Sequence, residues 1–267
     1  MPPPIAVDDE DEITEDEVEE AVEDTKEEVD NSPTPDDIVE EEAQLNHDDI
    51  DWDNRSFPQL SMQDYDQVYA DNRDSYYKNG NIHNAKKMYE SPNAKPGMAY
   101  SYSQDMNHRL NAGQPLDADS KFMATYLTKG LHPIGKDCTL KRGAHDTVLN
   151  QVLSKMGINR TYDQLSQSQL QSALVGQQFQ MKAFGSFGAN DSKNPFIGGS
   201  QGGGREVIIV ARTAASTKVI TGARAQEEFV TGIGQNCKIT DVKFTGGTVY
   251  PRVGGAKKEV YLYVDMW

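Results

Sequence analysis

The 267-residue sequence lacks the features that mark membrane and secreted proteins. It has no run of apolar residues long enough to span a membrane. The N-terminus, Met1-Pro2-Pro3-Pro4, has neither the basic nor the apolar region of a secretory signal. We therefore expect a protein with no membrane segment and no signal peptide, located in the cytoplasm unless another system delivers it elsewhere.

Cysteine is scarce, with Cys138 and Cys237 the only two residues of this type. Neither has a His or Cys partner at the spacing of a zinc site, so we predict no metal site. A disulfide between these two residues is one alternative, and it requires them to pair across neighbouring strands. Two reduced thiols are favoured, because disulfides persist in oxidising compartments and the chain has no export signal.

Two glycine motifs that bind nucleotides are also missing. No Gly-x-Gly-x-x-Gly follows a strand and opens a helix, which argues against a Rossmann domain. The glycine-rich stretch 198–204 is not followed by Gly-Lys-Ser or Gly-Lys-Thr, which argues against a phosphate loop. We interpret it as a flexible connection.

Charge is divided unevenly along the chain. Residues 1–53 hold 24 of the 42 acidic residues and one lysine, a charge of −23, whereas the remaining 214 residues carry 25 Lys and Arg against 18 Asp and Glu. The acidic segment 1–53 cannot bury enough apolar surface to offset its ordering entropy. We expect a disordered acidic tail at 1–54 and one globular domain at 55–267. The tail would mimic nucleic acid, restrain the basic body, or only solvate the protein. The basic residues of the body are scattered, which argues against nucleic acid as a partner.

Apolar periodicity predicts helices first and strands second. The expected helices cover 61–71, 103–111, 119–130 and 149–156, with another starting at Thr161 or Asp163 and ending before Gly176. The expected strands are 138–142, 179–184, 207–211, 218–220, 238–244 and 259–264, separated by glycine-rich turns that include 185–188 and Gly246-Gly247. This order indicates an α+β fold with a mainly antiparallel sheet rather than alternating βαβ units.

Three short stretches follow one another along the chain: Leu140-Lys141-Arg142-Gly143, Phe184-Gly185-Ser186 and Gln226-Glu227-Glu228. This order and spacing resembles the mono-ADP-ribosyltransferases, a family that includes bacterial toxins and phage enzymes that modify host proteins. The stretch Met106–Gly113 also fits a family helix with an Asn-x-x-Leu/Arg pattern, and 122–131 fits the helix before the arginine strand. The resemblance implies a split-sheet transferase core and delivery into a host cell by a virion or secretion system.

The resemblance implies that Arg142 grips the pyrophosphate of NAD, with Gly143 allowing close approach. An arginine suits this role because its planar fork binds phosphate oxygens at two points and keeps its charge. Phe184 and Phe196 are candidates for contact with the nicotinamide, although core packing is the better interpretation for Phe184. Arg205 is a further candidate for phosphate, and His145 for lining the site.

Ser186 corresponds to the first serine of the family motif, which steadies the catalytic carboxylate. Thr-Ser usually follows, whereas Phe187-Gly188 follows here, so two of the usual three hydroxyls are missing. This departure puts the hydrogen-bond network of the family in question. It also leaves room for a transferase fold that has lost activity.

Glu228 is the first candidate for catalysis, because a carboxylate stabilises the positive charge that grows at the anomeric carbon when the glycosidic bond breaks. We expect Gln226, two residues earlier on an extended segment, to point to the same side as Glu228, and Glu227 to point away. In the family, Gln at this position goes with acceptors other than arginine.

The sequence therefore predicts an NAD-dependent mono-ADP-ribosyltransferase that modifies a side chain of a host protein and releases nicotinamide. The alternative is a weakened transferase fold that serves as a phage-head or other structural component. A nucleic-acid-binding protein is a third class, which the scattered basic residues do not favour.

Overall fold

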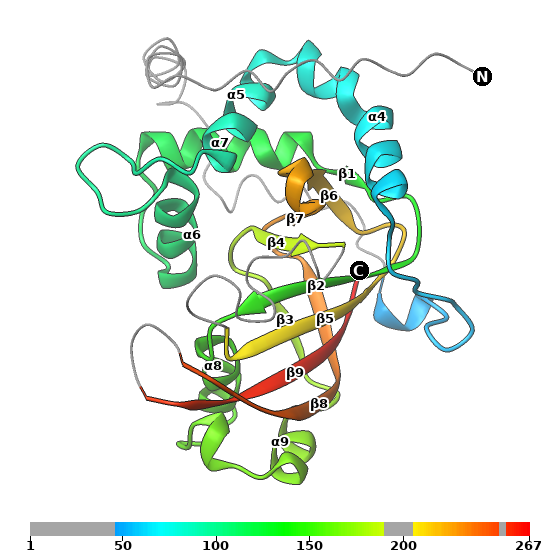
Figure 1. The fold of residues 1–267 in the computed structure, drawn as a ribbon, viewed down its shortest axis with the longest axis vertical. Coiled ribbons are helices and arrows are strands. Elements are labelled where there is room, and N and C mark those ends of the chain that lie inside the picture. The colour runs from blue at the N-terminus through cyan, green and yellow to red at the C-terminus, as the bar shows by residue number, and fades with distance from the viewer. Residues whose placement is uncertain (1–45, 190–204, 251–254) are drawn as a thin grey trace.

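The computed structural model describes residues 46–189, 205–250 and 255–267. Helices occupy the first part of these residues and a nine-stranded sheet the second, so the expected α+β fold is confirmed (Figure 1). Residues 1–45 of the expected acidic tail, and Phe196, lie outside the described residues.

Four helices precede the sheet: α4 (Met62–Lys78), α5 (Gly80–Glu90), α6 (Tyr102–Ala112) and α7 (Ala118–Gly130). The start of α4 follows from its sequence, because Ser61 and Asp64 form a capping box in which each side chain accepts the other's backbone N–H. Helix α5 is not among the expected helices. It starts immediately after Asn79, whose side chain accepts the backbone N–H groups of Asn81 and Ile82.

The remaining elements are β1 (His132–Pro133), β2 (Cys138–Ala144), α8 (Thr147–Lys155), α9 (Gln167–Leu174), β3 (Gln178–Gln180), β4 (Gly185–Gly188), β5 (Val207–Thr213), β6 (Lys218–Thr221), β7 (Glu228–Thr231), β8 (Asn236–Val249) and β9 (Lys257–Met266). Short 3-10 turns lie at His47–Asp49, Tyr162–Gln164 and Arg224–Gln226. The helix expected from Thr161 or Asp163 is thus one 3-10 turn followed by α9.

Two glycine-rich segments expected to be turns are strands instead. Residues 185–188 form β4, because each of them pairs with a residue of β7 in antiparallel register. Strand β4 and strand β3 also replace the single strand expected at 179–184. Gly246-Gly247 lies inside β8, where the register with β9 shifts between Phe244 and Thr248. Pairing with the distant strand β7 overrode the local turn preference of glycine in β4, whereas Gly246 keeps a left-handed backbone with φ of 79° at the register shift in β8.

The sheet has the order β1-β6-β7-β4-β2-β5-β9-β8-β3. Among these strands β5 and β9 pair in parallel, and the other neighbouring pairs are antiparallel. Strands β2 and β4 meet at one register position, Lys141↔Gly188. The sheet is therefore weakly joined there, between the group β1-β6-β7-β4 and the group β2-β5-β9-β8-β3.

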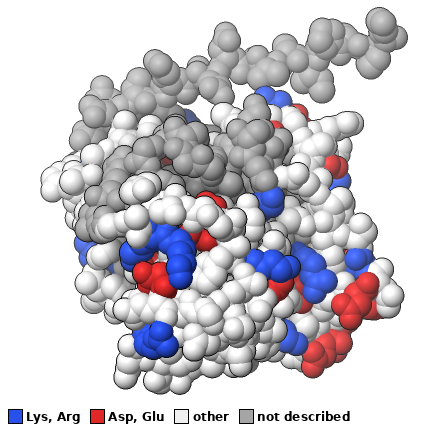
Figure 2. Space-filling model, turned by 60° about the horizontal axis from the view of Figure 1, so that its bottom comes forward, with Lys and Arg blue, Asp and Glu red and all other residues white. Residues whose placement is uncertain are grey.

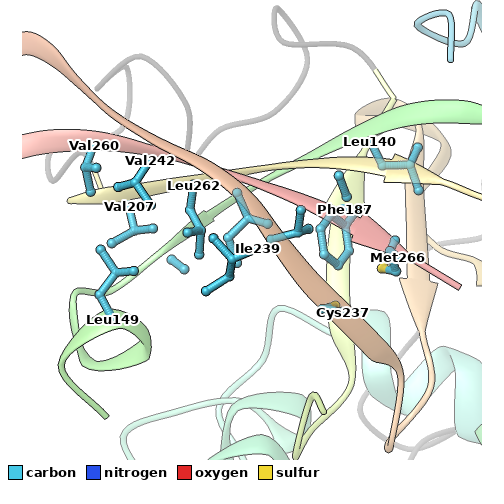
Figure 3. Packing of buried hydrophobic residues seen from close by; sticks show 14 of the residues in the cluster. Leu140, Leu149, Phe187, Val207, Cys237, Ile239, Val242, Val260, Leu262 and Met266 are labelled. Atoms are coloured by element: carbon cyan, nitrogen blue, oxygen red, sulfur yellow. The ribbon is translucent and has the colours of Figure 1, made fainter. Parts of the chain in front are cut away.

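Two apolar cores cover the sheet. The first lies between the strands and helices α4, α8 and α9, and it contains Leu140, Phe187 and Leu262 among the residues shown in Figure 3. The second joins helices α5, α6 and α7 to Phe184, Ile220 and Val230. Strand β4 and the residues before it therefore lie between the two cores.

The domain begins earlier than expected. Ile50 and Trp52, which fall within the expected disordered tail, are 6% exposed and pack with Ala214, Phe57 and Trp267. The His47 imidazole contacts the Asp265 carboxylate at 2.8 Å and stacks on the Trp52 ring. The boundary at residue 54 is therefore too late, because aromatic side chains in this segment find a partner surface at the ends of β5 and β9.

Cys138 and Cys237 are both buried free thiols, as the sequence analysis favoured. Burial raises the pKa of each thiol to about 12. Across the described residues we find no helix whose length and apolar character suit a bilayer crossing, and no cluster of three or more His, Cys, Asp or Glu that suits a metal ion. On the face drawn in Figure 2, Lys and Arg side chains lie in separate groups with Asp and Glu between them.

Candidate active site

The β4–β7 pair brings Ser186 and Glu228 onto one face of the sheet. Gly188 pairs with Glu228 and Ser186 pairs with Val230, and opposed residues of antiparallel strands project to the same side. Val230 belongs to the core formed with α5–α7, so this face is the one beneath those helices. Phe187 and Phe229 project to the opposite face, into the other core.

The Glu228 carboxylate is fixed by the turn that precedes it. Its Oε2 accepts the Ala223 backbone N–H at 3.0 Å, and its backbone exchanges hydrogen bonds with Gly222 and Ala223. The same turn is tied to α4, because the Tyr65 hydroxyl donates to the Gly222 carbonyl and Arg224 forms a two-point ion pair with Asp66 at 2.9 and 3.0 Å. One carboxylate oxygen of Glu228 is thus held by the backbone of this turn.

The expected alternation of Gln226, Glu227 and Glu228 is wrong. Gln226 ends the 3-10 turn Arg224–Gln226, and Glu227 has a left-handed backbone with φ of 48°, so the segment is not extended. Glu227 is 2% exposed, and its Oε2 has no hydrogen-bond partner in the described structure. Gln226 itself is half-buried beside the catalytic candidate.

Arg142 lies on the other side of β4 from Ser186. Its guanidinium is 5.9 Å from the centre of the Phe187 ring, and a Cβ added at Gly185 would lie 2.8 Å from its Nη1. Burial lowers the pKa of Arg142, while the nearby Tyr89 and Glu228 raise it and Arg205 lowers it. Within the described residues no carboxylate pairs with this guanidinium. Arg205 is a second cation close to the desolvated Arg142 guanidinium. Two cations with no carboxylate paired to Arg142 among the described residues favour an anionic ligand.

The sequence analysis missed Tyr89, the residue that connects the predicted ones. Its hydroxyl lies 2.9 Å from Ser186 Oγ, and its ring meets Phe184 edge to face. Burial and the charge of Glu228 raise the pKa of Tyr89 to about 12, while hydrogen bonding from Ser186 and the charge of Arg142 act the other way. Tyr89 is on α5, 97 residues before Ser186, so no local motif signals it.

Two further residues near Tyr89 carry polar groups toward the same region. Burial raises the pKa of Glu90, which is paired with Lys86, and the charge of Glu228 raises it further. Asn107, in the Asn-x-x-Leu stretch of α6, also acts on Tyr89 and lowers its pKa. The Asn107 Oδ1 atom is buried without a hydrogen-bond partner in the described structure.

The remaining predicted residues lie as follows. Phe184 is fully buried against Tyr89, as the core-packing interpretation expects, and its contact with nicotinamide stays a prediction. Gly143 is half-buried in β2 opposite Ile208. His145 contacts Glu206 and Arg205 rather than the β4–β7 residues.

Solved structures of known function share this fold. The chain is similar to the Clostridium limosum C3 exoenzyme, with a TM-score of 0.53 and 16% identity over 80% of this chain and 98% of that one. An ADP-ribosyltransferase from Clostridium botulinum matches with a TM-score of 0.53 and 13% identity over 79% and 99% of the two chains. A protein from S. aureus, whose structure was solved with NAD, matches with a TM-score of 0.51 and 11% identity over 80% and 98%.

The fold is therefore that of the bacterial ADP-ribosyltransferases, at low sequence identity. No protein-family model and no curated protein matches the sequence.

Proposed function

We propose that the chain is a mono-ADP-ribosyltransferase that transfers ADP-ribose from NAD to a protein side chain and releases nicotinamide. The observation that carries the proposal is the position of Glu228. In a transferase fold, it stands at the start of β7 on the face of Ser186, with one carboxylate oxygen fixed by the Ala223 N–H. The spacing of Arg142, Ser186 and Glu228 in the sequence supports the same proposal.

The residues present fit NAD as a substrate. Arg142 has a desolvated guanidinium without a carboxylate partner among the described residues, which suits a pyrophosphate. The buried Asn107 Oδ1 lacks a hydrogen-bond donor within the described structure, which suits an amide or hydroxyl of a ligand. Gly185 leaves room for the Arg142 guanidinium, because a Cβ at this position would lie 2.8 Å from Arg142 Nη1.

The reaction breaks the glycosidic C–N bond, and nicotinamide leaves with the bonding electron pair. The acceptor side chain forms the new bond to the anomeric carbon and loses a proton. Glu228 stabilises the positive charge that develops at that carbon, an effect that is strongest where water is excluded. Ser186 helps to orient the site on the same strand face.

The acceptor class is assigned to residues other than arginine, on the basis of Gln226. A neutral amide hydrogen-bonds an Asn, Gln, Thr or Ser side chain, whereas an arginine would lose its water without gaining a carboxylate partner. Gln226 occupies the turn that Asp66 and Tyr65 tie to α4, so its position is defined by the domain itself.

One observation favours a second candidate, a transferase fold that binds NAD without turnover and acts as a structural component. Phe187 and Gly188 replace two hydroxyl residues of the family motif, and Phe187 faces the core. Binding of NAD with no release of nicotinamide would favour this candidate.

The test uses purified full-length chain, NAD labelled on the adenosine side, and lysates of several cell types. The proposal predicts nicotinamide release and a labelled protein band, with mass spectrometry locating ADP-ribose on residues other than arginine. The Gln226→Glu variant should lower transfer to that native acceptor. Modification mainly on arginine would contradict the role of Gln226 alone, whereas no nicotinamide release in any lysate would contradict the proposed activity.

A further inference from the structure

Tyr89 brings a hydroxyl to Ser186 from outside the strand. On β4 the site-facing residues are Ser186 and Gly188, since Phe187 projects into the core on the other side. Gly188 lies directly opposite Glu228 and has no side chain to offer it. The nearest hydroxyl that the structure adds to Ser186 comes from α5, where the Tyr89 phenol contacts Ser186 Oγ at 2.9 Å.

The Tyr89 ring is held firmly enough to place that hydroxyl. It is 7% exposed and packs in the same core as Ala85, Met88 and Phe184, with the Phe184 ring centre 6.3 Å away in an edge-to-face contact. A buried aromatic side chain has two torsion angles and little freedom in such a core, so its hydroxyl is preorganised at little entropic cost.

The hydrogen bond between Tyr89 and Ser186 joins two hydroxyl groups. Either hydroxyl of the pair can be the donor, because each carries one proton and accepting lone pairs. Burial and Glu228 raise the pKa of Tyr89 and so keep the phenol protonated at neutral pH. When the phenol donates to Ser186 Oγ, the Ser186 proton is free for a further acceptor on the site-facing side of β4.

We propose that Tyr89 is a positioning residue whose phenol supplies, from α5, the hydroxyl that β4 lacks, and that it acts through Ser186. This inference rests on the proposed transferase function. It makes the altered serine motif compatible with turnover, because the hydrogen-bond partner of Ser186 comes from a helix instead of from the next residues of the strand.

The test is a double-mutant cycle in the full-length protein, with nicotinamide release measured as kcat and KM for NAD. Tyr89→Phe keeps the ring and its packing and removes the hydroxyl. We expect kcat to fall about tenfold and KM to change less than about threefold, because one hydrogen bond that orients a catalytic group is lost. Tyr126→Phe on α7, which removes a hydroxyl from the same helical layer, should retain wild-type kcat.

The cycle separates positioning from plain structural support. If Tyr89 acts through Ser186, the double variant Tyr89→Phe with Ser186→Ala should be no slower than Ser186→Ala alone. Equal melting temperatures of Tyr89→Phe and Tyr126→Phe, within about 2 °C, should accompany the loss of kcat. Independent, multiplying losses in the double variant would overturn the inference, as would wild-type kcat in Tyr89→Phe.

Nicotinamide release by the wild-type protein distinguishes an error in the role of Tyr89 from an error in the proposed transferase function. If it releases nicotinamide and Tyr89→Phe matches it, only the role of Tyr89 is wrong. If the wild-type protein binds NAD but releases no nicotinamide, the proposed function is wrong, and the inference falls with it.

Discussion

Gly222 and the Glu228 carboxylate are packed so closely that a side chain at position 222 would displace this carboxylate. A Cβ added to Gly222 would lie 2.2 Å from Glu228 Oε2, well inside van der Waals contact. The same carboxylate oxygen accepts the N–H of the next residue, Ala223, at 3.0 Å. The glycine at position 222 therefore leaves room for the observed position of the Glu228 carboxylate.

Gly222→Ala should displace the Glu228 side chain and lower nicotinamide release by at least about tenfold, because a misplaced charge stabilises the transition state poorly. The control is Gly80→Ala, where an added Cβ meets nothing within 4 Å. That variant should keep wild-type activity. Wild-type activity in a folded Gly222→Ala protein would show that the observed position of Glu228 is not needed for turnover.

Arg142→Lys should weaken NAD binding about tenfold, because a single point charge replaces a fork that contacts two phosphate oxygens. Isothermal titration calorimetry with the folded variant measures this change. Arg73→Lys, an exposed substitution on α4, serves as the matched control and should leave affinity unchanged. Unaltered affinity in Arg142→Lys would exclude a grip on the pyrophosphate by this residue.

Truncation should locate the start of the domain. A chain that begins at Asn46 keeps the contacts of His47, Ile50 and Trp52, so its melting temperature should equal that of the full protein at physiological salt. A chain that begins at Asn54 loses Trp52 from its stack with Phe57 and Arg212, and should melt several degrees lower. Equal melting of both truncations would show that the segment adds no stability.

Asp64 should make stability depend on pH in the acid range. The Lys136 hydrogen bond and the Ser61 backbone N–H lower its pKa from 3.8 to about 2. The folded state then binds fewer protons than the unfolded state, so stability is present above pH 3.8 and is lost as the pH falls toward 2. Asp64→Asn should destabilise the protein at pH 7 in urea titrations, and the difference should shrink over that interval. A penalty that stays the same from neutral pH down to about 2.5 would contradict it.

Local sequence signals located those parts of the fold that depend on neighbours in the chain. Ser61 with Asp64 predicts the start of α4, and the apolar period of Leu149 to Leu153 predicts α8. Helix α5 was not predicted because Asn79-Gly80 is typical of a turn that ends a helix, whereas Asn79 is the N-cap of a new helix. Strand β4 was not predicted because its glycines favour turns in isolation. These residues form a strand by pairing with β7.

Local sequence signals likewise predicted only part of the candidate site. Arg142, Ser186 and Glu228 have recognisable neighbours in the sequence, and the structure places Ser186 and Glu228 on one strand face. Tyr89 has no local signal, since its partner is 97 residues away. The left-handed backbone of Glu227 also has none, because glutamate rarely adopts it and the turn around Gly222 imposes it.

The measurement that tests the account most directly is nicotinamide release and NAD binding by Glu228→Gln, with Glu259→Gln as a control of the same chemistry on β9. Losing the charge while keeping the shape should lower kcat at least about a hundredfold and change the Kd for NAD less than about threefold. The control should keep wild-type kcat. Turnover by Glu228→Gln at the wild-type rate would contradict the catalytic role of Glu228 and the active site built around it.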